Sequence, residues 1–129
     1  MKLFLDNTFA RRMARILREL DEDVIHLQEV DGFTGATKDE EWMPYVAQQG
    51  WPAVTGDGRI LTRPHERELW RKLSLTLVVM HKGYTSLPLW DQAVFLLKHW
   101  PELRKRATKA RRGEALMVKA NGKIEPLRP

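Results

Sequence analysis

Short apolar runs alternate along the chain with longer stretches in which apolar residues recur every three or four positions. The short runs predict buried strands, and the longer stretches, such as the one through Phe9, Met13, Ile16 and Leu20, predict amphipathic helices. The expected strands are residues 2–5, 23–27, 51–55, 75–80 and 114–119. The expected helices are residues 8–20, 37–49, 64–73, 87–100 and 102–112.

Capping and breaking residues set the expected ends of several elements. Thr37 resembles a helix N-cap with Glu40 as its capping-box partner, and Gly50 fits the end of that helix. Pro101 is expected to close one helix or to begin the next, because proline lacks the N–H that a helix interior needs. Asn121-Gly122 is a turn signal before a short tail.

The order of these elements predicts the fold class. Strands that alternate with helices favour a mostly parallel sheet covered on both faces, which is an α/β fold. A chain of 129 residues suits one domain with one core, so we expect residues 1–129 to form a single domain.

The composition of the chain limits the cellular compartments and the binding partners that we expect. The net charge of +5, with a sequence pI near 9.7, is compatible with an acidic partner such as nucleic acid. The absence of cysteine excludes disulfides and thiolate chemistry. No run has the length of a signal-peptide core or of a membrane span, so we expect a cytoplasmic protein without a membrane partner.

Acidic residues follow two of the predicted strands and open one of the predicted helices. The strand at residues 2–5 ends at Asp6, the strand at residues 51–55 is followed by Asp57, and Asp39-Glu40-Glu41 lies at a helix start. Carboxylates gathered at the carboxyl edge of a sheet predict a site for Mg²⁺ or Mn²⁺, with Asp6, Asp39 and Asp57 as ligands. Other roles stay open: Asp6 as a helix cap, Asp57 as a turn residue and Glu40 as a capping residue.

Polar residues beside these acids are candidates for substrate binding. Asn7 and Thr55 are adjacent to the strand ends, and each is equally suited to capping. Arg59 and Arg63 follow Asp57 and are candidates for phosphate contacts, which dominate affinity for nucleic acids.

The acidic segments also resemble a known family. The segments Leu5-Asp6-Asn7, Asp39-Glu40-Glu41-Trp42 and Thr55-Gly56-Asp57-Gly58-Arg59 resemble the PIN-like nucleases, and more closely the VapC-type toxins. The later segment Leu87-Pro88-Leu89-Trp90 also fits that subgroup, so the resemblance covers nearly the whole chain.

This resemblance implies a fold, an activity and partners. It implies a three-layer α/β/α sandwich and metal-dependent cleavage of RNA. Its catalytic acids would be Asp6, Asp39 with Glu40, and Asp57. As the toxin of a toxin–antitoxin pair, the protein would bind a small antitoxin and would often form a homodimer.

The chain departs from the family pattern after Asp57. Another acid usually follows at this point, but here the sequence is Gly58-Arg59-Ile60, and the next acid is Glu66. Two alternatives therefore stay open. One is a non-catalytic relative that binds RNA or a protein partner. The other is a receiver-like domain phosphorylated at Asp57, although Asn7 stands where a receiver carries a second acid and no Lys-Pro pair follows the last predicted strand.

Overall fold

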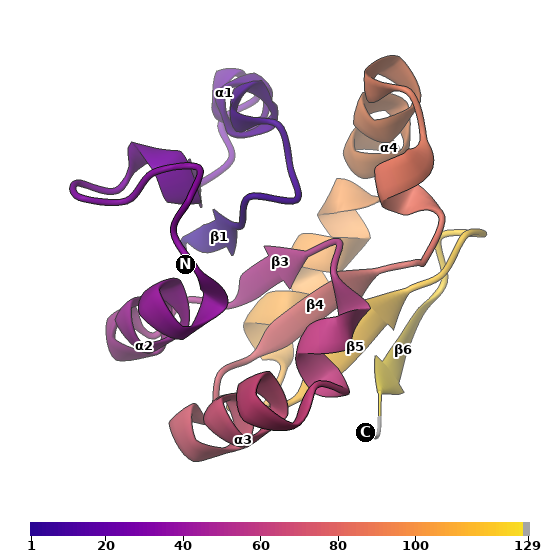
Figure 1. Ribbon diagram of the computed structural model, residues 1–129. Helices are drawn as coiled ribbons and strands as arrows, with labels where there is room; N and C mark the ends of the chain where they lie inside the picture. Colours follow the sequence, from indigo (N-terminus) through magenta and orange to yellow (C-terminus); the bar gives the residue numbers. More distant parts are fainter. Residues whose placement is uncertain (128–129) are drawn as a thin grey trace.

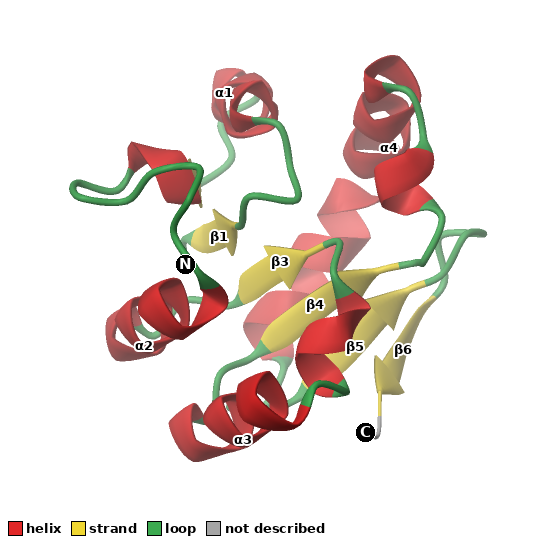
Figure 2. Ribbon diagram, in the orientation of Figure 1, coloured by secondary structure: helices red, strands yellow, loops and turns green. Residues whose placement is uncertain are grey.

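The computed structural model describes residues 1–127, which form one six-stranded sheet with helices on both sides (Figures 1 and 2). The strands are β1 (Leu3–Leu5), β2 (Val24–His26), β3 (Ala53–Thr55), β4 (Leu77–Met80), β5 (Ala115–Val118) and β6 (Ile124–Leu127). The strand order is β2-β1-β3-β4-β5-β6, and all neighbours are parallel except β5 and β6. The predicted α/β fold with a mostly parallel sheet is confirmed.

Two helices cover each face of the sheet. They are α1 (Arg11–Glu19), α2 (Asp39–Gln49), α3 (Pro64–Leu73) and α4 (Leu89–Lys109). Leu3 and Leu5 pack in a cluster with buried residues of α1 and α4, whereas Phe4 packs with those of α2 and α3. This alternation along one strand follows from the pleat, which turns successive side chains to opposite faces. The result is an α/β/α sandwich with one apolar core on each side.

Two helix ends lie where the sequence places them. Gly50 caps α2 with a φ of 77°, a left-handed conformation that glycine adopts without strain. Pro64 occupies the first turn of α3, where its missing N–H costs nothing.

The expected start of α2 is wrong by one residue. The N-cap is Lys38 rather than Thr37, and Glu41 rather than Glu40 returns to the cap, where its carboxylate accepts a hydrogen bond from the Lys38 N–H at 3.1 Å. The Thr37 hydroxyl instead accepts from the Thr34 N–H at 2.8 Å and so closes the preceding loop.

The expected break at Pro101 is also wrong, because α4 continues through this residue. Trp100, Leu103 and Ala107 are buried on both sides of the proline and belong to the same apolar cluster. Burying a large apolar side chain contributes about 1.5–3 kcal/mol. Packing on this scale offsets the cost of a proline inside a helix, about 3 kcal/mol.

The predicted short tail after Asn121-Gly122 contains a strand. Residues Ile124–Leu127 form β6, which pairs antiparallel with β5 so that Ile124 faces Val118. Gly122 supplies the positive φ, 86°, that the connecting turn needs. Within residues 1–127, no helix is long and apolar enough to cross a membrane.

Candidate functional site

The candidate site lies at the carboxyl edge of the sheet between β1 and β3. From β1 the chain moves outward to β2 on one side, and from β3 it moves to β4 on the other side. The loops after β1 and β3 therefore diverge and leave a crevice, which is where open α/β sheets bind ligands. Asp6 follows β1 and Asp57 follows β3, so both strand-end acids border this crevice. The predicted meeting of the two strand ends is confirmed by the Asp6 N–H, which donates to the Val54 carbonyl at 3.2 Å.

Asp6 is buried at the base of the site, with 3% of its surface exposed. One carboxylate oxygen accepts from the Thr8 N–H at 3.0 Å and from the Thr8 hydroxyl at 2.5 Å, and the other accepts from the Thr55 hydroxyl at 2.5 Å. Burial raises the pKa of Asp6 to about 6, although the hydrogen bonds from Thr55 and Thr8 oppose that shift. Asp6 is thus held in one orientation and ionises less readily than an ordinary aspartate.

Hydroxyl groups join the ends of β1 and β3. The Thr55 oxygen that donates to Asp6 also accepts from the Asp57 N–H at 3.0 Å. The Thr8 oxygen accepts from the Gly56 N–H at 2.7 Å. Thr55 therefore orients the carboxylate of Asp6 and holds the backbone of Asp57, and the two loops are fixed relative to each other.

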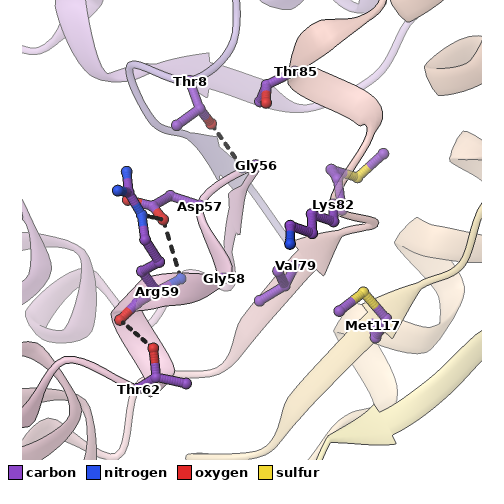
Figure 3. A pocket seen from close by; sticks show the side chains of 11 residues that line it. Thr8, Gly56, Asp57, Gly58, Arg59, Thr62, Val79, Lys82, Thr85 and Met117 are labelled. Carbon is purple, nitrogen blue, oxygen red and sulfur yellow. Dashed lines mark hydrogen bonds and ion pairs between the residues drawn. The ribbon is translucent and has the colours of Figure 1, made fainter.

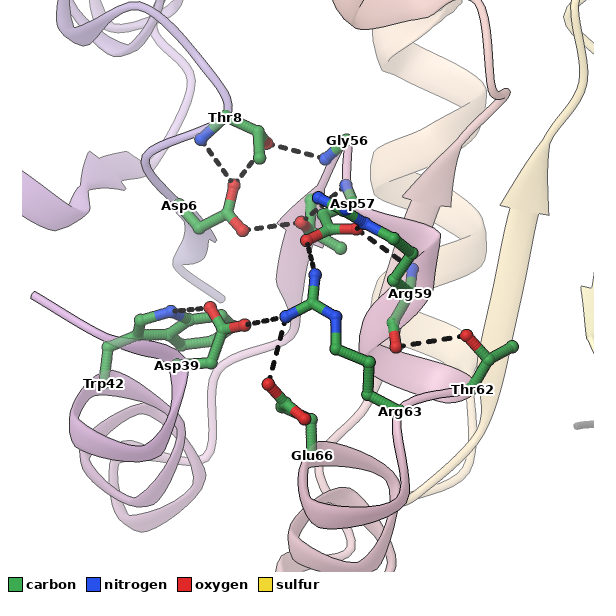
Figure 4. Close-up of polar contacts among 11 residues, drawn as sticks. Asp6, Thr8, Asp39, Trp42, Gly56, Asp57, Arg59, Thr62, Arg63 and Glu66 are labelled. Atoms are coloured by element: carbon green, nitrogen blue, oxygen red, sulfur yellow. Dashed lines mark hydrogen bonds and ion pairs between the residues drawn. The ribbon is translucent and has the colours of Figure 1, made fainter.

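Asp57 is surrounded by two arginines (Figure 4). One of its oxygens accepts from the backbone N–H and from Nε of Arg59, both at 3.0 Å, and the other lies 2.5 Å from Nη2 of Arg63. Burial opposes ionisation of Asp57, but the hydrogen bonds and charges of the two arginines outweigh it and lower its pKa. Asp57 is accordingly a carboxylate at neutral pH.

Asp39 and Glu66 approach the same arginine from two helices. Nη1 of Arg63 lies 3.9 Å from Oδ2 of Asp39 and 3.0 Å from Oε1 of Glu66. The other oxygen of Asp39 accepts from the Trp42 indole N–H at 3.0 Å. Burial raises the pKa of Asp39; the Trp42 hydrogen bond opposes this shift, and the nearby charge of Asp57 adds to it. Three carboxylates from separate elements thus surround one guanidinium (Figure 4).

Two predicted site residues point elsewhere. Glu40 is exposed, and its Oε2 lies 3.7 Å from Nε2 of His65, away from Arg63. Asn7 donates its amide to the carbonyls of Thr34 and Gly35 and accepts from Gln28, so it fastens the loop before α2.

The donor set has the right chemistry for a hard divalent cation. Asp39, Asp57 and Glu66 offer carboxylate oxygens, which Mg²⁺ and Mn²⁺ prefer, and Asp6 lies beneath them. Their common neighbour is the Arg63 guanidinium, whose positive charge reduces the repulsion among these carboxylates. Across residues 1–127, no three histidine, aspartate or glutamate side chains are arranged closely enough to share one ion as they stand. A cation that entered here would compete with Arg63.

A comparison with protein families bears directly on this crevice. The family model described as a PIN like domain matches residues 1–82, which is well over half of the chain. The chain belongs to the PIN-like domain family. PIN-like domains are often nucleases, and the matched region contains every acid of the crevice. Searches of curated proteins and of solved structures found no match to the chain.

Several contacts at this site of the PIN-like domain were not predicted. Thr8 binds Asp6 and Gly56, and Trp42 orients Asp39. Sequence spacing contained one usable signal, since Trp42 follows Asp39 by three residues and so shares its face of α2. No comparable signal indicated that Arg63 would lie among the acids.

Proposed function

We propose that this PIN-like domain is a metal-dependent endoribonuclease that cleaves phosphodiester bonds in RNA. The observation that carries the proposal is the convergence of Asp39, Asp57 and Glu66 on one cationic group above the buried Asp6. Asp6, Asp39 and Asp57 would hold the Mg²⁺ or Mn²⁺ ion. When bound, such an ion lowers the pKa of a water molecule and stabilises the charge that develops on the phosphate during hydrolysis.

The residues of the chain have separate roles in this proposal. Trp42 and Thr55 orient Asp39 and Asp6, so that these two acids need little rearrangement. Arg63 neutralises the acids in the absence of metal, and once displaced it is free to contact a phosphate of the substrate. The side chain of Arg59 is 76% exposed at the edge of the crevice, where it can contact a second phosphate.

The proposal is tested by incubating labelled single-stranded RNA with the purified protein and increasing Mn²⁺ or Mg²⁺. Cleavage should require the metal, stop on addition of EDTA, and be lost in Asp6→Asn and Asp57→Asn proteins whose circular dichroism matches that of the wild type. Retained cleavage in both variants would rule out the assigned acids.

A non-catalytic role in binding RNA or a protein is the second candidate. It is favoured by the position of Arg63 among the acids and by the absence of an acid at Gly58-Arg59-Ile60. Calorimetric titration with Mn²⁺ separates the two candidates, because the enzyme must bind the ion and the non-catalytic relative need not. The receiver interpretation has no support from the family match, which assigns a different family.

We further propose that the nuclease acts in the cytoplasm as the toxin of a toxin–antitoxin pair. A surface suited to a protein partner lies between α1 and α4, where Ile16, Trp90 and Val94 form an apolar groove. Trp90 is 79% exposed, which is unusual for so large an apolar side chain. A homodimer is the other candidate occupant.

Co-expression tests the antitoxin proposal. The product of a small open reading frame next to the gene should co-purify with the protein and suppress RNA cleavage, whereas Trp90→Ser should weaken the complex. If light scattering instead shows a dimer of the isolated chain that Trp90→Ser converts to a monomer, the groove belongs to the homodimer and the antitoxin assignment fails.

A further inference from the structure

A cavity of about 720 Å³ adjoins the acidic crevice and shares Asp57 and Arg59 with it, on the side of Asp57 toward β4 and β5 (Figure 3). Its volume is within the range of sites that bind small molecules, about 300–1,000 Å³. Apolar side chains, hydroxyl groups and cations line different parts of it. The residues that matter here are Val79 and Met117, Thr62 and Thr85, and Arg59 and Lys82.

The charge of the cavity favours an anionic ligand. Arg59 and Lys82 both line it, whereas Asp57 is the one acid among its lining residues. The Lys82 side chain points into the cavity (Figure 3), and no carboxylate within residues 1–127 lies within ion-pair distance of its ammonium group. Unlike Arg59 and Arg63, which are engaged with Asp57, Lys82 is available to an incoming anion.

The part of the cavity over β4 and β5 is apolar. Val79 of β4 lies at its floor and is 1% exposed, whereas Met117 of β5 is only half-buried. A ligand with a charged group at Lys82 and a flat apolar group over Met117 would satisfy both the cationic and the apolar parts.

Gly56 lines the cavity where Thr85 approaches its backbone closely. A Cβ atom on Gly56 would lie 2.5 Å from Cγ2 of Thr85. Gly56 has no positive φ. Close approach rather than backbone conformation therefore accounts for the fit of glycine at this position.

We propose that this cavity binds one nucleotide of single-stranded RNA, adjacent to the nucleotide whose phosphate reaches the acids. Lys82 contacts the phosphate of the bound nucleotide, and Met117 contacts the face of its base. This inference rests on the proposed action on RNA and adds a binding site that includes residues outside the acidic crevice. No aromatic residue lines the cavity, so the base is bound less tightly than at sites built on aromatic stacking.

The test measures RNA binding without cleavage. A fluorescein-labelled single-stranded RNA of nine nucleotides is titrated in EDTA, and anisotropy is recorded at several salt concentrations. Lys82→Gln should weaken binding about five-fold at 0.1 M salt and reduce the slope of log K against log salt by about 0.7, as expected for one lost phosphate contact to a single strand. Lys72→Gln is the matched control, since Lys72 is exposed at the far end of α3.

A second variant probes the apolar part of the cavity. Met117→Thr retains a residue suited to a strand and removes the apolar contact, so binding should weaken while the salt slope stays unchanged. If Lys82→Gln binds RNA as tightly as Lys72→Gln and the slope of log K against log salt is unchanged, the inference is overturned even if the wild type cleaves RNA. The inference is also overturned if adenosine monophosphate binds as tightly as the RNA, since the cavity would then be a site for free nucleotides.

These outcomes are independent of those for catalysis. Lys82-dependent binding in a protein that never cleaves RNA supports the cavity assignment and refutes the nuclease. Cleavage by the wild type, together with unchanged RNA binding by both variants, supports the nuclease and refutes the cavity assignment.

Discussion

The guanidinium of Arg63 lies against the carboxylate of Asp57, with 2.5 Å between Nη2 and Oδ2. The same guanidinium also lies within ion-pair distance of Asp39 and Glu66, so one arginine is the shared counter-ion of three acids of the crevice. An enzyme that binds a divalent cation at these acids must first displace this internal cation. In the proposed nuclease, Arg63 would therefore lower the apparent affinity for the metal.

Arg63→Gln should bind Mn²⁺ more tightly than the wild type. Each half-exposed ion pair contributes up to about 1 kcal/mol, and loss of the competing charge should raise the affinity on the order of ten-fold. Isothermal titration calorimetry measures the change. Arg71→Gln, a change of an exposed arginine near the end of α3, is the control. Weaker binding by Arg63→Gln would mean that Arg63 assists the metal rather than competing with it.

The buried Asp6 should make the stability of the fold depend on pH. Its pKa is about 6 in the folded state and 3.8 as the reference value, so the folded protein holds a proton that the unfolded chain loses first. The contribution of Asp6 to the free energy of unfolding is therefore greatest below about pH 4. It falls by about 3 kcal/mol in total as the pH rises through about 6.

Asp6→Asn should remove this dependence, because the amide is neutral at every pH. Denaturant unfolding in EDTA between pH 4 and 8 should show the full decline in wild type and in the exposed control Asp31→Asn, and a smaller decline in Asp6→Asn, to which the raised pKa of Asp39 still contributes. An equal decline in all three proteins would assign the pH dependence to other groups.

The backbone at Gly56 should not tolerate even a methyl group. The added Cβ would meet Thr85 and lie 3.2 Å from the Thr8 hydroxyl, so Gly56→Ala should lower the free energy of unfolding by about 1–3 kcal/mol through overpacking. Adding Thr85→Ser removes the methyl group that clashes and should restore part of the loss. Chemical denaturation of the two variants checks this, and no recovery in the double variant would place the strain elsewhere.

Much of the fold could be predicted because burial leaves a local pattern. Strands such as Leu77–Met80 read as apolar runs, and Pro64 and Gly50 mark helix ends through their own backbone preferences. Pro101 misleads because the choice between one helix and two is made by the packing of Trp100 and Leu103 against residues distant in the sequence. The tail strand was missed for a similar reason, since β6 is stabilised by its pairing with β5.

The site was predictable to the extent that strand ends determine it. Asp6 and Asp57 meet because parallel strands end at one edge. Asp39 and Glu40 could not be separated by sequence, yet successive residues of a helix point about 100° apart, and only Asp39 faces the crevice. The place of Arg63 depends on the reach of a long side chain across three elements, which no local pattern encodes.

The proposed nuclease activity is tested by comparing metal-dependent cleavage of RNA by wild type and Asp57→Asn. The rate of cleavage of a labelled single-stranded RNA is measured in Mn²⁺, with Asp31→Asn as the matched control at an exposed aspartate. We expect wild type and Asp31→Asn to cleave at similar rates and Asp57→Asn to be slower by at least about a hundred-fold. Cleavage by Asp57→Asn at the wild-type rate, or cleavage that persists in EDTA, would contradict the proposal.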